Sequence, residues 1–334
     1  MRTIWDGVNR LLDDAESAAG VTEHGLQLLA IRRWRETGRA VPPAWLDDQR
    51  RMAAISLSLP GMLTRIRDAV VGPIVLMKGP ELAELYPHPA LRPYGDLDLL
   101  VEDAGAAQRA LIELGLSPEA GHVERGYHYH LATLAHDAFP LRVEVHRRPN
   151  WVSWLSPPPV TELLAAAVPS RLDTPGFSAL DPVHHALAVC AHAWNHGPLL
   201  QASHLLDIAL LARRCDPDEV TRTAERWGID RIWRTSSRAA DSLLLGEGVT
   251  LPLRLGGRHL TRLRERSVAG LYASRLLGTL WAPTSAVAAR ALWKLLIDGV
   301  RPRDGESWRT ELPHLVRLAR AATHPVSDYR RLDR

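Results

Sequence analysis

The sequence predicts an α+β protein in which a small α/β core lies between two helical segments, and two observations support this. First, apolar side chains recur at helix spacing in residues 1–70 and along most of the chain after residue 150. Second, three short runs at 73–77, 96–101 and 141–148 have the length and pattern of strands. We therefore expect an N-terminal helical segment at 1–70, a core at 71–150 and a C-terminal helical domain at 151–334.

Each part contains elements that follow from local pattern. Leu28, Ile31 and Trp34 share one face of an N-terminal helix, and the pattern resumes after Pro42-Pro43. The expected core elements are a buried strand at 73–77 leading through a glycine turn into the helical ELAELY, a strand at 96–101, a helix at 104–116 and a strand at 141–148 with 127–135 beside it.

The C-terminal part begins with a well-marked helix. Asp181 is placed as its N-cap, Pro182 occupies the first helical position, and Gly197 ends it. Further helices are expected at about 201–214, 217–227, 229–245, 257–278 and 284–299. Within the first helix Cys190 lies among apolar neighbours and is expected in the core.

Composition places the chain among globular proteins that do not span membranes. Hydrophobic residues make up 46% and charged residues 24% of its 334 residues, and no apolar run approaches 18 residues. The start of the chain lacks an apolar signal core, and two cysteines are too few for a disulfide framework, so we expect a cytoplasmic protein. A net charge of +3 is no evidence for nucleic-acid binding.

The second and third strands carry the acids that suggest chemistry. Alternate side chains of a strand share a face, so Asp96 and Asp98 project together while Leu97 points into the core. Glu144 lies on the polar face of the later strand and offers a third carboxylate. Three such acids suit a pair of divalent cations in phosphoryl transfer.

A glycine turn precedes these acids. Gly79 lies between a strand and a helix, where the backbone can approach a phosphate. Lys78 and Arg92 are candidates to neutralise the phosphate charge. Lys78 is conspicuous because the chain contains only one other lysine, Lys294.

These residues together resemble the nucleotidyltransferase superfamily with a polymerase-β-like core, and more closely a bacterial family of uncharacterised nucleotidyltransferases. The resemblance covers about 70–210. It rests on Met77-Lys78-Gly79, Tyr86-Pro87-His88-Pro89, Arg92-Pro93, Asp96-Leu97-Asp98-Leu99-Leu100 and Glu144-Val145-His146, followed by a helical region with His192, His196 and Asp207.

The resemblance implies a mixed sheet and a metal-dependent transferase. Asp96 and Asp98 would hold two Mg²⁺ ions that bridge the phosphates of an NTP, and Glu144 would share the ion nearest the acceptor. A hydroxyl or amine of a small-molecule, peptide or RNA acceptor would attack the α-phosphorus and release pyrophosphate. ATP is one candidate among the NTPs.

The histidines remain open to several interpretations. His192 and His196 share a helix face and, with Asp207, have the spacing of a helical metal site. Alternatively Asp207 hydrogen-bonds a helix histidine and ties two helices together, or these residues and His146 face the substrate cleft.

Two alternatives to an ordinary transferase stay open. Pro80 stands where the superfamily usually has glycine or serine, which motivates a catalytically degenerate nucleotide- or peptide-binding module. A toxin-like nucleotidyltransferase that modifies tRNA would require a basic surface beside the cleft.

Overall fold

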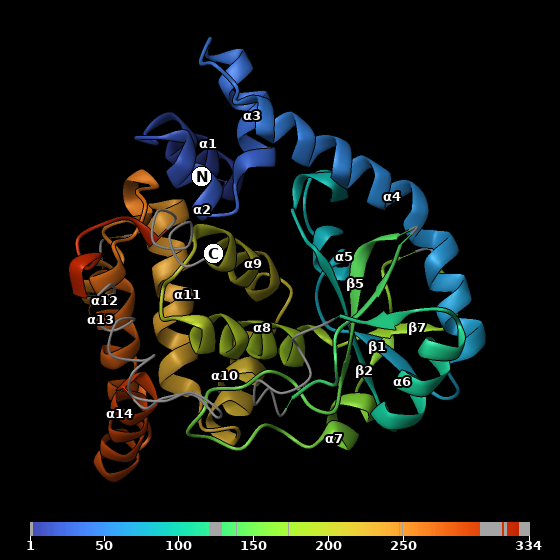
Figure 1. The fold of residues 1–334 in the computed structure, drawn as a ribbon. Coiled ribbons are helices and arrows are strands. Elements are labelled where there is room, and N and C mark those ends of the chain that lie inside the picture. The colour runs from blue at the N-terminus through green and yellow to red at the C-terminus, as the bar shows by residue number, and fades with distance from the viewer. Residues whose placement is uncertain are drawn as a thin grey trace.

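A mixed seven-stranded sheet and a larger set of helices form the molecule, which a computed structural model describes at residues 3–119, 129–137, 139–172, 174–246, 248, 250–300, 316 and 319–326. Figure 1 shows the sheet on one side and most C-terminal helices on the other. The predicted α+β class and mixed sheet are confirmed. None of the helices in these residues is long and apolar enough to cross a bilayer.

The N-terminal helices join both halves of the molecule. They are α1 (Ile4–Asp13), α2 (Ala18–Glu23), α3 (Gln27–Glu36) and α4 (Pro43–Ala69). The long helix α4 packs along the sheet side, on β5. Helix α1 instead lies so close to α11 that a Cβ on Gly7 would come within 1.8 Å of the Leu244 carbonyl oxygen. The N-terminal segment therefore contacts both the sheet and the C-terminal helices.

The sheet has the strand order β3-β4-β5-β2-β1-β7-β6. Its strands are β1 (Ile74–Leu76), β2 (Asp96–Val101), β3 (Ser117–Pro118), β4 (Leu134–His136), β5 (Phe139–His146), β6 (Val168–Pro169) and β7 (Phe177–Ala179). The pairs β2–β5 and β1–β7 are parallel and the others antiparallel. Helix α6 (Ala104–Glu113) contacts β2 and β5.

The sheet differs from the expectation in three places, of which the first is the unpredicted edge strand β3. Strands β6 and β7 follow residue 150, so the sheet extends into the segment expected to be helical. Of the run at 127–135, only the last two residues belong to a strand, as the start of β4, and His130 forms an isolated bridge with His146. The first two residues of the run lie outside the described part of the chain. The division of the chain at residue 150 stays a prediction.

The C-terminal helices largely follow the sequence pattern. They are α7 (Val160–Ala165), α8 (Pro182–His196), α9 (Ala202–Ala212), α10 (Pro217–Arg226), α11 (Asp230–Leu245), α12 (Leu251–Gly256), α13 (Val268–Gly278) and α14 (Ser285–Val300). Asp181 caps α8 by accepting from the backbone N–H groups of Val183 and His184, which confirms that helix start.

The helix expected at 257–278 is wrong over its first half. A 3₁₀ turn (Leu260–Arg262) occupies that region, with further 3₁₀ turns at Pro89–Leu91 and Thr279–Trp281. Leu263 has a left-handed φ of 45°, which a continuing helix excludes, and Ser267 then caps α13. The expected ELAELY helix likewise shortens to one turn, α5 (Pro80–Ala83).

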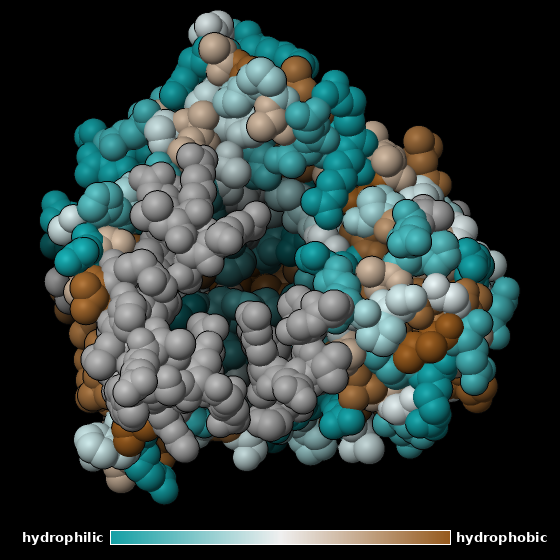
Figure 2. Space-filling view, in the orientation of Figure 1, coloured by the Kyte–Doolittle hydropathy of each residue, from teal (hydrophilic) through white to brown (hydrophobic). Residues whose placement is uncertain are grey.

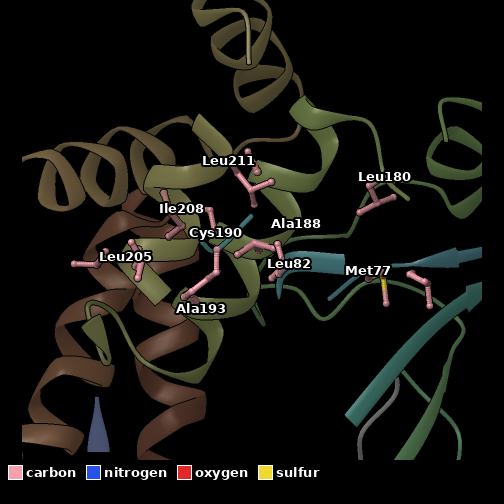
Figure 3. Packing of buried hydrophobic residues seen from close by; sticks show 14 of the residues in the cluster. Met77, Leu82, Leu180, Ala188, Cys190, Ala193, Leu205, Ile208 and Leu211 are labelled. Atoms are coloured by element: carbon pink, nitrogen blue, oxygen red, sulfur yellow. The ribbon is translucent and has the colours of Figure 1, made fainter. Parts of the chain in front are cut away.

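Apolar side chains of α8 and α9 belong to the same buried cluster as Met77, which follows β1. Figure 3 shows buried side chains of these two helices beside Leu82 of α5 and near Met77. Cys190 is fully buried in this cluster, as expected. The packing places the polar end of α8 beside the glycine turn that follows β1.

Candidate active site

Strand pairing sets two of the predicted acids side by side. In the parallel β2–β5 ladder Asp98 is the register partner of Glu144, and Leu100 is the partner of His146. Ligand atoms of Asp98, Glu144 and His146 all lie within 4.8 Å of one another. The Asp98 side chain is fully buried, whereas that of Glu144 is 20% exposed.

Asp98 is the electrostatic centre of this group. Its Oδ1 lies 2.8 Å from His146 Nε2 and 3.2 Å from Lys78 Nζ. Burial by itself would raise the pKa of Asp98, but the charge of Lys78 and the hydrogen bond from His146 hold that pKa well below its usual range. Asp98 Oδ2 is buried and has no hydrogen-bond partner in the described structure. Oδ2 of this buried carboxylate therefore has no hydrogen-bond donor among the described residues.

His146 joins the two carboxylates. Its Nε2 lies 3.7 Å from Glu144 Oε2 as well as close to Asp98. Burial opposes protonation, yet the hydrogen bond to Asp98 and the neighbouring carboxylate of Glu144 raise the pKa of His146. Glu144 also accepts a hydrogen bond from Thr133 Oγ1 at 3.3 Å, and the pKa of Glu144 is lowered by His146 against the effect of burial. The imidazole thus holds two acids in place.

Asp96 lies at the start of β2, partly exposed and outside the group of three. Burial and the neighbouring charge of Asp98 raise the pKa of Asp96 to about 6. Lys78 and Arg92 lower it less strongly. A divalent cation beside Asp96 and Asp98 would relieve this repulsion.

The glycine turn before α5 touches the same strand. Gly79 has a φ of 61°, and a Cβ there would lie 2.7 Å from the Asp96 carbonyl oxygen. The turn is anchored by Glu81, a fully buried residue that sequence analysis missed. Its carboxylate accepts hydrogen bonds from Ser170 Oγ at 2.6 Å and Arg171 Nη1 at 2.6 Å. The partners lie about ninety residues later, so no local pattern signals this role.

Lys78 contacts both Asp98 and helix α8. Its ammonium lies 3.2 Å from Asp98 Oδ1 and 3.3 Å from His192 Nε2. Burial and the charge of Lys78 hold the pKa of His192 well below its usual value, so the neutral imidazole accepts from the ammonium. Lys78 is therefore beside the acids, as a phosphate-binding cation requires.

Arg92 takes a different place from the one expected. Its Nη2 lies 2.8 Å from Asp207 Oδ2 and its Nε 3.0 Å from Oδ1, and Nη1 donates to the Gly79 carbonyl at 3.3 Å. Tyr86 OH also donates to Asp207 at 2.8 Å. Arg92 is thus engaged in tying the glycine turn to α9, and the expected link between Asp207 and a helix histidine is not formed.

The two helix histidines meet each other instead. The ring centroids of His192 and His196 are 4.5 Å apart. Asn150 is a buried residue that no pattern in the sequence singles out. Its side-chain nitrogen lies 3.2 Å from His192 Nδ1 and 3.5 Å from His196 Nε2. Among the described residues, the one group of at least three metal-ligating side chains is Asp98, Glu144 and His146. The helical metal site considered for His192, His196 and Asp207 is not formed.

Figure 2 shows a hollow with hydrophilic residues in its floor on the face drawn in Figure 1, between the sheet and the helices. The arrangement can hold a divalent cation and position a phosphate beside it.

A family model described as "Uncharacterised nucleotidyltransferase" matches residues 13–244, more than half of the chain. No curated protein and no solved structure matches the chain. The match includes β1, β2, β5, the glycine turn and helices α8 and α9.

Proposed function

Because the chain belongs to the uncharacterised nucleotidyltransferase family and is a transferase, we propose that it moves a nucleoside monophosphate from an NTP to a hydroxyl or amine of an acceptor, with Mg²⁺ as cofactor. In this reaction the acceptor atom bonds to the α-phosphorus, the bond to pyrophosphate breaks, and the acceptor loses its proton. The single observation that carries the proposal is the pairing of Asp98 with Glu144 at one buried, polar position of the sheet.

The residues present fit a hard divalent cation. Asp98 Oδ2 is buried without a partner among the described residues, Glu144 is adjacent, and burial together with the charge of Asp98 raises the pKa of Asp96. Carboxylate oxygens are the ligands that Mg²⁺ prefers. We propose that Asp96, Asp98 and Glu144 hold the metal. Bound there, it would neutralise phosphate charge and lower the pKa of the attacking hydroxyl.

The remaining residues orient the carboxylates and neutralise the phosphate charge. His146 holds Asp98 and Glu144 in position through its Nε2. Lys78 places a positive charge beside Asp98, where it can bind a phosphate oxygen. The backbone of Gly79 brings the turn against β2 and lets a phosphate approach. Arg92 acts on the nucleotide only through this turn, because its guanidinium is held by Asp207.

Binding of Mg²⁺ with each of the four NTPs tests the proposal. We expect one NTP to raise the melting temperature of the wild type only with Mg²⁺ present, since a ligand that binds the native state stabilises it. Asp98→Asn should abolish that response. Asp103→Asn is the matched control, because Asp103 caps α6 on the surface and asparagine caps equally well. Failure of the wild type to bind any Mg·NTP complex would overturn the proposal.

Pyrophosphate release distinguishes an enzyme from a binding module. Slow release by the wild type, lost in Asp98→Asn and kept in Asp103→Asn, supports transfer. If an acceptor-containing extract stimulates no release although Mg·NTP binds tightly, the catalytically degenerate module is the better description.

A further inference from the structure

Helix α8 contacts the residue pair Met77-Lys78 at two points. His185 and His192 are seven residues apart in this helix, so they lie on one face, about two turns from each other. His185 Nε2 donates to the Met77 carbonyl at 2.7 Å, and His192 Nε2 lies 3.3 Å from Lys78 Nζ. One imidazole therefore fixes the backbone just before Lys78, and the other contacts the end of its side chain.

The hydrogen bond between Lys78 and His192 has a defined direction. An ammonium group has three N–H donors and no acceptor, so Lys78 donates and His192 Nε2 accepts. Burial and the charge of Lys78 lower the pKa of His192, which keeps the ring neutral. Only the neutral ring has an unprotonated nitrogen that can accept this bond.

These contacts leave one donor of Lys78 for a ligand. Two of its three ammonium hydrogens are directed to Asp98 Oδ1, at 3.2 Å, and to His192 Nε2. The Lys78 side chain is 17% exposed, whereas that of Asp98 is fully buried. The third hydrogen is therefore available to an oxygen that approaches from the exposed side, and the two existing contacts set its direction.

Lys78 and a divalent cation would share the Asp98 carboxylate. The ammonium lies on Oδ1, while Oδ2 is buried and has no hydrogen-bond partner among the described residues. A second acceptor for the ammonium, His192 Nε2, keeps it from turning onto both oxygens. Oδ2 can then bind a metal while Oδ1 keeps Lys78 nearby.

Resting on the proposed function above, we propose that His192 is a positioning residue for nucleotide binding. It holds the Lys78 ammonium on the Oδ1 side of Asp98, so that Oδ2 stays open to the metal and the remaining N–H faces a phosphate oxygen of the NTP. His192 acts through Lys78 and does not itself contact the phosphate.

A double-mutant cycle on Mg·NTP affinity tests whether His192 acts through Lys78. His192→Leu removes the acceptor and Lys78→Met removes the ammonium, and each should weaken binding by about tenfold or more, as loss of a charged hydrogen bond does. The double variant should bind no more weakly than Lys78→Met. His192→Gln should restore the affinity, because its amide oxygen can accept from the ammonium.

His204→Leu is the matched control. His204 lies in α9, burial lowers its pKa to about 4, and it forms no hydrogen bond with Lys78 in the described structure. This variant loses a neutral imidazole, as His192→Leu does, and should bind Mg·NTP as the wild type does.

A second measurement needs no nucleotide. The chain contains only two lysines, Lys78 and the exposed Lys294, so protein labelled with [ε-¹³C]lysine gives two NMR signals, of which that of Lys294 is an internal reference. A side chain held by two partners has two inequivalent ε protons. His192→Leu should shift the Lys78 signal and reduce this inequivalence, while His192→Gln keeps it and Lys294 is unchanged in both.

Additive losses of affinity in the double variant would overturn the inference, because they would show that His192 acts independently of Lys78. A His192→Leu protein with the Lys78 signal and the Mg·NTP affinity of the wild type would overturn it as well. Failure of the proposed function is a different outcome. The wild type then binds no Mg·NTP although the Lys78 signal still responds to His192→Leu, and both proposals are overturned.

Discussion

Arg92 donates to both carboxylate oxygens of Asp207, a residue 115 positions later in the chain. The pair is largely buried, with side-chain exposures of 14% and 3%, and Arg92 also donates to the carbonyl of Gly79. One guanidinium therefore joins the glycine turn of the sheet to helix α9. The position of the glycine turn therefore depends on the packing of α9 through this contact.

Replacing Arg92 should lower the free energy of unfolding more than it lowers the affinity for nucleotide. Arg92→Met leaves Asp207 buried with only Tyr86 as a donor, and breaking a buried ion pair in this way costs about 3–5 kcal/mol. Urea unfolding measures the loss. Arg32→Met is the control, because that side chain is 80% exposed and its ion pair is worth about 0–1 kcal/mol. If both variants are equally stable and only Arg92→Met binds nucleotide poorly, Arg92 contacts the phosphate, as the sequence suggested.

The glycine turn should tolerate no side chain. Gly79→Ala places a Cβ 2.7 Å from a carbonyl oxygen of β2, in addition to the strain of a positive φ. Gly38→Ala isolates the second effect, because Gly38 has a φ of 73° with no atom within 4 Å of the added Cβ. We expect Gly38→Ala to lose about 1 kcal/mol and Gly79→Ala distinctly more, together with Mg·NTP affinity. Equal stability and affinity in the two variants would show that the turn does not approach the phosphate.

In the absence of metal, ionisation of Asp96 should lower the free energy of unfolding as pH rises. Its pKa is about 6 in the folded protein against 3.8 for an unperturbed carboxyl, so the folded state holds this proton longer than the unfolded state does. The contribution of Asp96 to the free energy of unfolding is therefore lost as pH rises from about 4 to 6. Asp96→Asn removes the charge, and at pH 8 without metal it should be more stable than the wild type by about 1–3 kcal/mol.

The same variant should lose its response to Mg²⁺. Thermal unfolding of the wild type and Asp96→Asn is measured under four conditions, at pH 4 and pH 8 with either Mg²⁺ or EDTA. A variant less stable than the wild type at pH 8 in EDTA would contradict the assigned repulsion between Asp96 and Asp98.

Replacing Glu144 should lower the rate of turnover while changing the stability of the fold only slightly. It is 20% exposed and keeps its hydrogen bond from Thr133 when changed to glutamine. We expect Glu144→Gln to lower the rate of pyrophosphate release by about 100-fold or more with a small change in melting temperature. Glu113→Gln, at an exposed position of α6, is the control. Unchanged turnover would remove Glu144 from the proposed site.

Local pattern was sufficient to place the elements that carry the acids. The strand expected at 96–101 is β2 with the same bounds, because a short apolar run carrying two alternate acids is a short-range signal. The start of α8 followed from Asp181 and Pro182 for the same reason, since a capping side chain bonds to the next few backbone groups. Strands β6 and β7, with two and three residues, are too short to leave a pattern.

By itself, the sequence determined which residues are candidates for the chemistry, while tertiary structure decided which of them meet. Asp96, Asp98 and Glu144 could be chosen because side chains alternate along a strand. Only the β2–β5 register sets Asp98 beside Glu144, and only the docking of α8 and α9 turns Arg92 toward Asp207 and brings Asn150 to the helix histidines. These contacts span from about 40 to more than 100 residues of chain, and they form because burying the apolar faces of separate elements brings their polar ends together.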